Sequence, residues 1–230
     1  MEPTTAAVAT TVVAAADNMN PIARAFTEGG FVMYVILIIG LLTLFVVIER
    51  LVVLKSLRID KKDFNDNVFR MVLNGDLRQA ISYCDSKPAP LSNTVKAGLV
   101  QALNKRPDEE VQVAMDASVL RETPRLEGWI PFLAVFGNIA VLAGLLGTII
   151  GMIGSFRAVA TADPATKALL LAQGISHALN CTGFGLSVSI IAIVFYGLFQ
   201  HMVQHSENDM IESSMSLLNL VSSNRDKIKD

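Results

Sequence analysis

Residues 128–156 read GWIPFLAVFGNIAVLAGLLGTIIGMIGSF, which is 29 positions without Asp, Glu, Lys or Arg. Two further uncharged runs cover residues 29–48 and, with histidine neutral, residues 168–206. Because a helix needs roughly 20 residues to cross about 30 Å of hydrocarbon, each run is long enough to span a membrane. The chain is 52% hydrophobic and only 17% charged, whereas soluble domains average about 25% charged residues. We therefore expect an all-α integral membrane protein with three transmembrane helices, and not a soluble globular enzyme.

Basic residues set the expected orientation of these helices. Residues 1–28 contain three acids and one basic residue, whereas five Lys or Arg residues follow the first run between positions 50 and 62. Since Lys and Arg beside a membrane span stay cytoplasmic, we expect the N-terminus outside and the C-terminus inside. The predicted order is an exported tail (1–28), a first span (29–48), a cytoplasmic helical region (49–127), a second span (128–156), an external loop (157–167), a third span (168–203) and a cytoplasmic C-terminal helix or tail (204–230).

The N-terminal tail has one alternative interpretation. Residues 5–16 are small and apolar, like the core of a signal peptide. A signal peptide would have Lys or Arg before that core, but the first basic residue here is Arg24. An exported tail is therefore the expectation, and a processed signal is the alternative.

Residues 49–127 form one long polar segment with 13 basic and 12 acidic residues. Apolar residues recur in it at helical spacing, notably Val68, Met71 and Val72, and then Val95, Leu99 and Leu103. Such mixed charge is typical of long helices that extend into a solvated cytoplasmic helical bundle. The segment is too short and too polar to enclose a catalytic core.

Turn residues predict where these helices begin and end. Asp76 follows Asn74-Gly75 and is expected to cap a helix over residues 77–84. Pro107, followed by three acidic residues, predicts the start of another helix. We expect that helix to continue through Pro124 and Pro131 into the second span, with a bend.

Small residues follow one face of the second span. They stand in steps of 3, 4, 3, 4 and 3 residues, which is a heptad spacing that keeps one helix face. In lipid, such a face allows a second helix backbone to approach closely. We expect helix packing there, within one subunit or also between subunits, by Gly137, Ala140, Gly144, Gly147, Gly151 and Gly154.

Polar residues are sparse in the second and third spans, and none of them is a carboxylate. They include Asn138, Thr148, His177, Asn180 and Thr182. Because polar groups are costly in hydrocarbon, we expect this set to form an internal polar lining of an ion pathway. A single threonine has a simpler alternative, since its hydroxyl can bond the carbonyl one turn back in its own helix. If ions cross here, another chain must supply the titrating carboxylate.

The order of several motifs resembles a known family. The matching stretches are Glu49-Arg50, Asn74-Gly75-Asp76-Leu77-Arg78-Gln79-Ala80, Cys84 with Pro88 and Pro90-Leu91, Arg125-Leu126-Glu127, Pro131-Phe132-Leu133, Leu145–Met152, Gly174–Leu179 and Thr182–Leu186. Together they resemble the MotA/TolQ/ExbB proton-channel family, on its TolQ/ExbB side. The resemblance covers about residues 30–205 in the expected order.

This resemblance implies a function and partners. Members form a homopentamer of three-span subunits around two copies of a single-span ExbD/TolR-like partner, in the inner membrane of Gram-negative bacteria. A membrane aspartate of that partner faces two threonines, which correspond here to Thr148 and Thr182. Protons, or sodium ions in some members, pass this site and drive rotation. The motor energises TonB-dependent import, Tol-type envelope maintenance or gliding motility, through a TonB/TolA-like or gliding effector.

One position departs from the family pattern. Members of this type commonly have glutamate where this chain has His177. Three interpretations stay open: histidine relays protons itself, it is a neutral hydrogen-bond donor within the subunit, or this chain couples differently, to another ion.

Other function classes find little support in the sequence. A membrane serine hydrolase would use Ser187 or Ser189 with His177, but Ser189 stands where the G-x-S-x-G turn needs its last glycine. His201 and His205 are one turn apart but lack an acidic third ligand within the span. We expect no enzyme activity, no metal and no cofactor. A structural membrane scaffold without ion flux is the alternative, because it explains the glycine face equally well.

Nucleic-acid binding and a disulfide framework are also not expected. The net charge is −2, and no basic stripe with interleaved aromatic residues occurs. Cys84 and Cys181 lie in segments of opposite character, one polar and one apolar.

Overall fold

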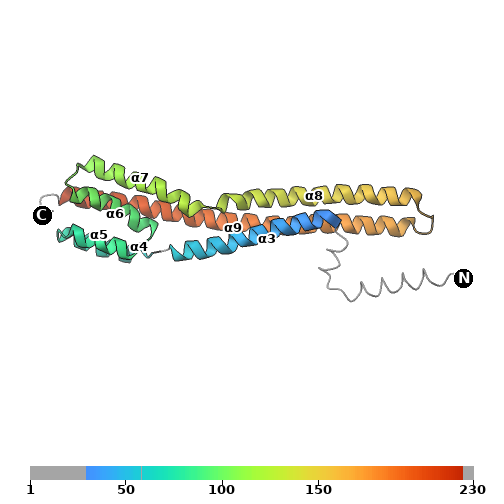
Figure 1. Ribbon diagram of the computed structural model, residues 1–230, viewed down its shortest axis with the longest axis horizontal. Helices are drawn as coiled ribbons and strands as arrows, with labels where there is room; N and C mark the ends of the chain where they lie inside the picture. Colours follow the sequence, from blue (N-terminus) through green and yellow to red (C-terminus); the bar gives the residue numbers. More distant parts are fainter. Residues whose placement is uncertain (1–29, 58, 225–230) are drawn as a thin grey trace. The chain divides into compact units, whose positions relative to one another are not determined.

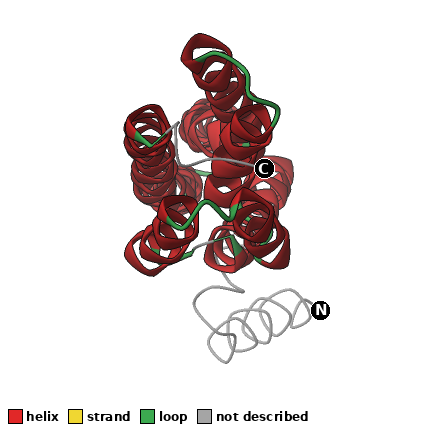
Figure 2. Cartoon of the chain, turned by 90° about the vertical axis from the view of Figure 1, so that its left-hand side faces the viewer, coloured by secondary structure: helices red, strands yellow, loops and turns green. Residues whose placement is uncertain are grey.

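Helices joined by short loops make up the described part of the chain, as Figure 2 shows. The structure is a computed structural model that describes residues 30–57 and 59–224. The predicted exported tail, residues 1–28, and the last six residues lie outside this part. The helices are α3 (Gly30–Ser56), α4 (Lys61–Leu73), α5 (Leu77–Ser86), α6 (Pro90–Leu103), α7 (Asp108–Glu127), α8 (Ile130–Thr161) and α9 (Lys167–Ser223), labelled in Figure 1.

Three helices are long and apolar enough to cross a membrane, and they contain residues 30–48, 130–156 and 168–206 of the three uncharged runs. The helices extend beyond the predicted spans. Helix α3 continues to Ser56 and α8 to Thr161, and only residues 162–166 separate α8 from α9. Helix α9 runs without a break from Lys167 to Ser223, so the predicted C-terminal helix is a continuation of the third one. Which residues of these helices lie within a bilayer stays a prediction.

The described residues form two compact units. One comprises residues 30–45 and 132–194, and the other residues 46–131 and 195–224. In the first unit α3 buries residues at helical spacing, with Met33, Ile36 and Ile39 at most 8% exposed. Thr43 continues this buried face and donates its hydroxyl to the Ile39 carbonyl at 2.8 Å.

The second unit is a helical bundle with an apolar core. The side chain of Asp60 accepts hydrogen bonds from the backbone N–H groups of Lys62 and Asp63 and so caps α4. Helix α4 then buries one face, consisting of Phe64, Val68 and Val72. Lys61 joins α4 to α9 through ion pairs with Asp209 at 2.9 Å and Glu212 at 2.5 Å. The predicted helical spacing in this region therefore corresponds to a real core face.

Two local predictions in this unit need correction. Asp76 stands at the N-cap position of α5, but its side chain makes no capping hydrogen bond. Val95 and Leu99 are fully buried as expected, whereas Leu103 is 37% exposed and Ala102 takes its place in the core. Leu103 is the last residue of α6, where the chain turns away from the core.

Both cysteines are free and buried. Burial raises the pKa of the Cys84 thiol to about 11, so the thiol is protonated at neutral pH. The expectation that no disulfide joins Cys84 to Cys181 stays a prediction.

The junction between α7 and α8 is a break and not the expected proline bend. Helix α7 continues through Pro124 and ends at Glu127, and α8 begins at Ile130 with Pro131 in its first turn. Between them Gly128 has φ +42°, a conformation that side chains with a Cβ rarely adopt.

Buried Arg50 of α3 stabilises this break. Its guanidinium donates to the carbonyl of Leu126 at 3.3 Å and is held by Glu49 at 2.6 and 2.9 Å. These bonds satisfy a carbonyl at the end of α7 that has no partner within the helix. The guanidinium occupies the space where a Cβ on Gly128 would lie.

Replacing Gly128 by alanine is expected to destabilise the second unit by about 1–3 kcal/mol, because the backbone strain adds to displacement of Arg50. The measurement is the thermal unfolding midpoint in detergent, followed by circular dichroism. Gly197→Ala is the matched control, since nothing lies within 4 Å of a Cβ built at Gly197 on helical α9. Equal midpoints for Gly128→Ala and the unaltered chain would contradict this account of the junction.

Candidate functional site

The first unit is held together by an unusually close contact between α8 and α9. A Cβ built on Gly144 would lie 3.1 Å from the Cys181 carbonyl oxygen and 3.2 Å from the Thr182 Cα. A Cβ built on Gly185 would lie 2.5 Å from the carbonyl oxygen of Ala140, which is itself fully buried. These neighbours are backbone atoms, which no side-chain rotation can move. The two helices therefore meet backbone to backbone.

Most of the predicted glycine face lies against α9. A Cβ on Gly137 would meet Ala192 at 3.3 Å, one on Gly147 would meet Cys181 at 2.7 Å, and one on Gly151 would meet His177 at 3.1 Å. Gly154 differs, because nothing lies within 4 Å of its built Cβ among the described residues.

Helix α9 carries a complementary row of small residues that the sequence analysis did not single out. Its members are buried or half-buried and follow one another at steps of 3 or 4: Gly174, Ala178, Cys181, Gly185, Ser189 and Ala192. The hydroxyl group of Ser155 on α8 occupies the space where a Cβ on Gly174 would lie. The spacing of small residues in residues 174–192 was the signal that could have identified this face.

Thr182 connects the two helices by a hydrogen bond. Its hydroxyl donates to the Gly144 carbonyl across the contact at 3.2 Å and is half-buried. Thr148 stands one turn after Gly144 on α8, and its hydroxyl donates to the carbonyl of Leu145 in its own helix at 2.6 Å. Thr148 therefore bonds a carbonyl of its own helix, which is the simpler alternative for a threonine in a span. Thr182 does not, because its hydroxyl bonds a carbonyl of α8.

His177 lies at the same contact, one to two turns before Thr182 on α9. Its ring is 3.1 Å from a Cβ built on Gly151 and 3.6 Å from one built on Gly30, the first residue of α3. Within the described ranges, no side chain forms an ion pair or hydrogen bond with His177. Of the described residues, Gly30 and Gly151 therefore lie beside the imidazole.

The structure does not bring Asn138 and Asn180 into this cluster. Asn138 is exposed and Asn180 is half-buried, and neither makes a side-chain hydrogen bond to another described residue. In a membrane an amide on an outer helix face would need a partner from a neighbouring chain or from water. That Asn138 and Asn180 line an ion pathway stays a prediction.

Large apolar side chains cover the outer faces of α3, α8 and α9. The most exposed of them include Phe31 (82%), Phe45 (65%), Leu142 (63%), Leu179 (65%) and Ile190 (62%). Soluble monomers rarely expose contiguous apolar surface on this scale. Lipid or other protein chains would have to cover it.

The alternative catalytic groups are not assembled as a hydrolase would require. Ser187 donates its hydroxyl to the Gly183 carbonyl at 2.8 Å, and Ser189 is buried. His205 lies 3.7 Å from Asp209, one turn away, while His201 is exposed. In the part of the chain that the structure describes, no three His, Cys, Asp or Glu side chains gather as metal ligands.

Comparison with protein families matches residues 86–212 to the model of the MotA/TolQ/ExbB proton channel family. This range contains all of α8 and most of α9, including Thr148, His177 and Thr182. It also contains α6 and α7 of the second unit. The match therefore covers the contact described above.

Comparison with individual proteins finds relatives of two kinds. The Tol-Pal system protein TolQ of Pseudomonas aeruginosa is 42% identical over 91 residues, which are 40% of this chain and 39% of that protein. The biopolymer transport protein ExbB of Pseudomonas putida is 34% identical over 94 residues, covering 41% of this chain and 28% of that protein. A putative biopolymer transport protein ExbB homolog of Methanothermobacter thermautotrophicus is 28% identical over 196 residues, covering 84% and 68%. The chain thus spans less than half the length of the TolQ and ExbB relatives from Pseudomonas.

The α8–α9 contact makes a direct prediction about two neighbouring glycines. Gly185→Ala forces a methyl group against the Ala140 carbonyl, so the helices must separate, at a cost of about 1–3 kcal/mol. The thermal unfolding midpoint in detergent should fall. Gly183→Ala is the control, because nothing lies within 4 Å of its built Cβ. If both variants unfold at the same temperature, the backbone contact does not stabilise this unit.

Proposed function

Because the chain belongs to the MotA/TolQ/ExbB proton channel family, we propose that it is the ion-channel subunit of a membrane motor driven by the proton or sodium motive force. The observation that carries this proposal is the threonine pair at the α8–α9 contact. Thr182 reaches across to Gly144, and Thr148 stands one turn further along α8. The role is transport, without an enzymatic reaction, a metal or a cofactor.

The proposed topology has three membrane-spanning segments, with the N-terminus outside and the C-terminus inside. The spans are residues 29–48, 128–156 and 168–203, and the helices over residues 49–127 lie in the cytoplasm. Its support is the asymmetry of charge, because Arg50, Lys55, Lys61 and Lys62 all follow the first uncharged run. The proposed location is the inner membrane of a Gram-negative cell, and the similarity to TolQ and ExbB of two Pseudomonas species supports it.

The ion path in this proposal runs beside the two threonine hydroxyls. A hydroxyl can donate to a carboxylate or accept from a protonated one, so it suits a carboxylate that gains and loses a proton. The uncharged runs at residues 128–156 and 168–206 contain no such carboxylate. A single-span partner of the ExbD/TolR type therefore supplies a membrane aspartate.

The assembly in this proposal is a homopentamer around two copies of that partner. The exposed apolar faces of α3, α8 and α9 support an assembly in which lipid and neighbouring subunits cover them. Asn138 and Asn180 would then contact the lumen or another chain. The unpaired state of these amides in one subunit supports this arrangement.

The names of two relatives bear on the process that the motor drives, without deciding it. Those relatives are named for the Tol-Pal system and for biopolymer transport. We propose that the motor drives Tol-type envelope maintenance, TonB-dependent import or gliding motility, coupled to a TonB/TolA-like or gliding effector. Co-purification of the partner and effector with this subunit would decide among the three.

Loss of both threonine hydroxyls should stop ion flow. Thr148→Val with Thr182→Val keeps side-chain volume but removes two groups that can bond a charged carboxylate, so we expect flux to fall tenfold or more. The measurement is flux into liposomes that hold this subunit and its co-expressed partner. Comparing sodium-free buffer with and without a protonophore identifies the ion.

The matched control is Thr43→Val, a buried threonine of α3 whose hydroxyl bonds its own helix at 2.8 Å. It should leave flux unchanged, and size-exclusion chromatography should show that all variants still assemble. Unchanged flux in an assembled double variant would remove both threonines from the mechanism. It would favour a structural scaffold, the alternative role.

His177 is proposed to act as a neutral hydrogen-bonding group within the subunit, beside Gly30 and Gly151. His177→Gln keeps a polar group of similar reach, so flux and its dependence on pH between 5 and 8 should persist. Both are measured in the same liposomes. Loss of flux in the glutamine variant, with wild-type flux that titrates in this range, would instead identify the histidine as a proton relay.

A further inference from the structure

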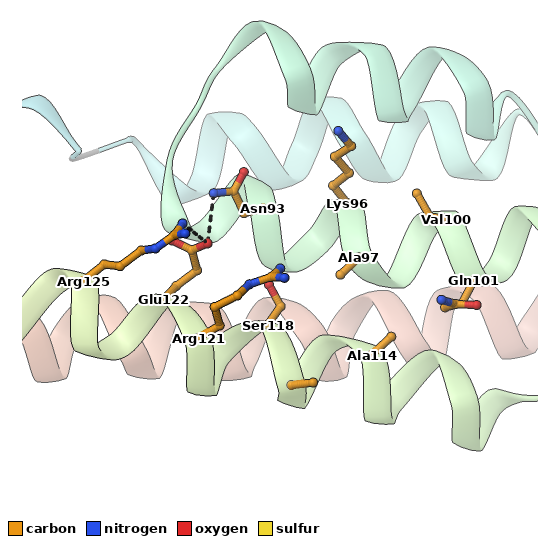
Figure 3. Close-up of a pocket in the computed structure, with 11 residues that line it drawn as sticks. Asn93, Lys96, Ala97, Val100, Gln101, Ala114, Ser118, Arg121, Glu122 and Arg125 are labelled. Atoms are coloured by element: carbon orange, nitrogen blue, oxygen red, sulfur yellow. Dashed lines mark hydrogen bonds and ion pairs between the residues drawn. The ribbon is translucent and has the colours of Figure 1, made fainter.

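A pocket of about 530 Å³ lies between α6 and α7, entirely within the second unit (Figure 3). Helix α7 lines it with Ser118, Arg121, Glu122 and Arg125, which follow the i, i+3, i+4, i+7 spacing of one helix face. Helix α6 contributes a facing set that includes Lys96 and Gln101. A volume of about 300–1,000 Å³ is usual for ligand sites in proteins. The proposed ion path uses none of these residues.

The charged groups of this pocket are not balanced. Three cations, Lys96, Arg121 and Arg125, line it with a single acid, Glu122. Lys96 forms an ion pair with Asp85, and Arg125 forms one with Glu122 at 3.0 Å. Arg121 is exposed and makes no ion pair or hydrogen bond within residues 30–57 and 59–224. The pocket therefore presents one uncompensated guanidinium.

Ser118 adds an unused hydrogen-bonding group. Its side chain is only 1% exposed, and its hydroxyl has no hydrogen-bond partner in the described chain. Nearly all buried polar groups in native proteins have a partner. Ser118 stands three residues before Arg121 on the same face of α7, and Figure 3 shows the Gln101 amide directed from α6 toward that helix. Different oxygens of one phosphate-bearing ligand would accept from these three side chains.

We propose that this pocket binds a phosphate-bearing anion, with Arg121, Ser118 and Gln101 as its donors. Donors that approach from two facing helices suit a tetrahedral group whose oxygens point in several directions. The arginine fork pairs with two phosphate oxygens at once. A lone carboxylate would present oxygens in one plane only and would leave most of the volume empty.

The phosphate has two possible sources. One is a phospholipid headgroup, since Arg125 stands five residues before Ile130, where membrane-capable α8 begins. The other is a soluble phosphate compound. Both present the same chemistry to the pocket, so the probes and not the variants must distinguish them.

The test uses the full chain in an uncharged detergent at fixed ionic strength, with two probes. These are inorganic pyrophosphate and short-chain phosphatidylglycerol, each titrated by calorimetry. Arg121→Gln should weaken binding about tenfold or more, and Ser118→Ala about threefold to tenfold. Because the Ser118 hydroxyl bonds no residue within 30–57 and 59–224, the alanine variant should fold normally. Arg78→Gln, an exposed arginine on α5 outside the pocket, is the matched control and should bind like the unaltered chain.

Binding of phosphatidylglycerol alone supports the proposal with a lipid as the source, and binding of pyrophosphate supports it with a soluble source. Failure of both probes to saturate at about 1 mM would overturn it. Equal weakening by Arg121→Gln and Arg78→Gln would also overturn it, because the attraction would then be nonspecific. Neither result depends on ion flux, so this site and the proposed channel function can fail separately.

Discussion

The backbone contact between α8 and α9 is the constraint on which the rest of the first unit depends. Lipid is as apolar as leucine, so the hydrophobic effect does not drive membrane helices together, and close packing and hydrogen bonds must do so. Glycine at 144 and 185 removes the two Cβ atoms that would keep the backbones apart. The same closeness brings the Thr182 hydroxyl within 3.2 Å of the Gly144 carbonyl. The same two glycines therefore allow both the close packing of α8 and α9 and the hydrogen bond of Thr182.

The second unit is stabilised by a different combination of forces. Its core consists of apolar helix faces such as Phe64, Val68 and Val72, and a buried cation, Arg50, satisfies the end of α7. A buried charge is tolerated only when it is paired and hydrogen-bonded, and Glu49 and the Leu126 carbonyl meet both conditions. The bonded guanidinium of Arg50 therefore holds the backbone at Gly128 in one conformation.

The sequence was sufficient for the features that depend on one helix at a time. Uncharged length identified the three long apolar helices, and periodicity identified the packing face of α8. It could not show which helix covers that face, because a period describes one surface and not its neighbour. The break at Gly128 was missed since it depends on Arg50, which lies 76 residues before Leu126. Likewise, the position of α6 opposite the arginines and serine of α7 depends on how the two helices are rotated.

The same limit applies to the site residues. Thr148 and Thr182 lie in the matched family region, and the structure adds that one hydroxyl bonds its own helix while the other crosses to α8. Asn138, by contrast, is exposed in a single chain. Its surroundings in an assembly depend on chains that this sequence does not describe.

The most direct test of the central claim is a density map of the purified assembly with its single-span partner. The account predicts both threonine hydroxyls facing a lumen that contains the partner helix; hydroxyls that face lipid around an empty centre would contradict it.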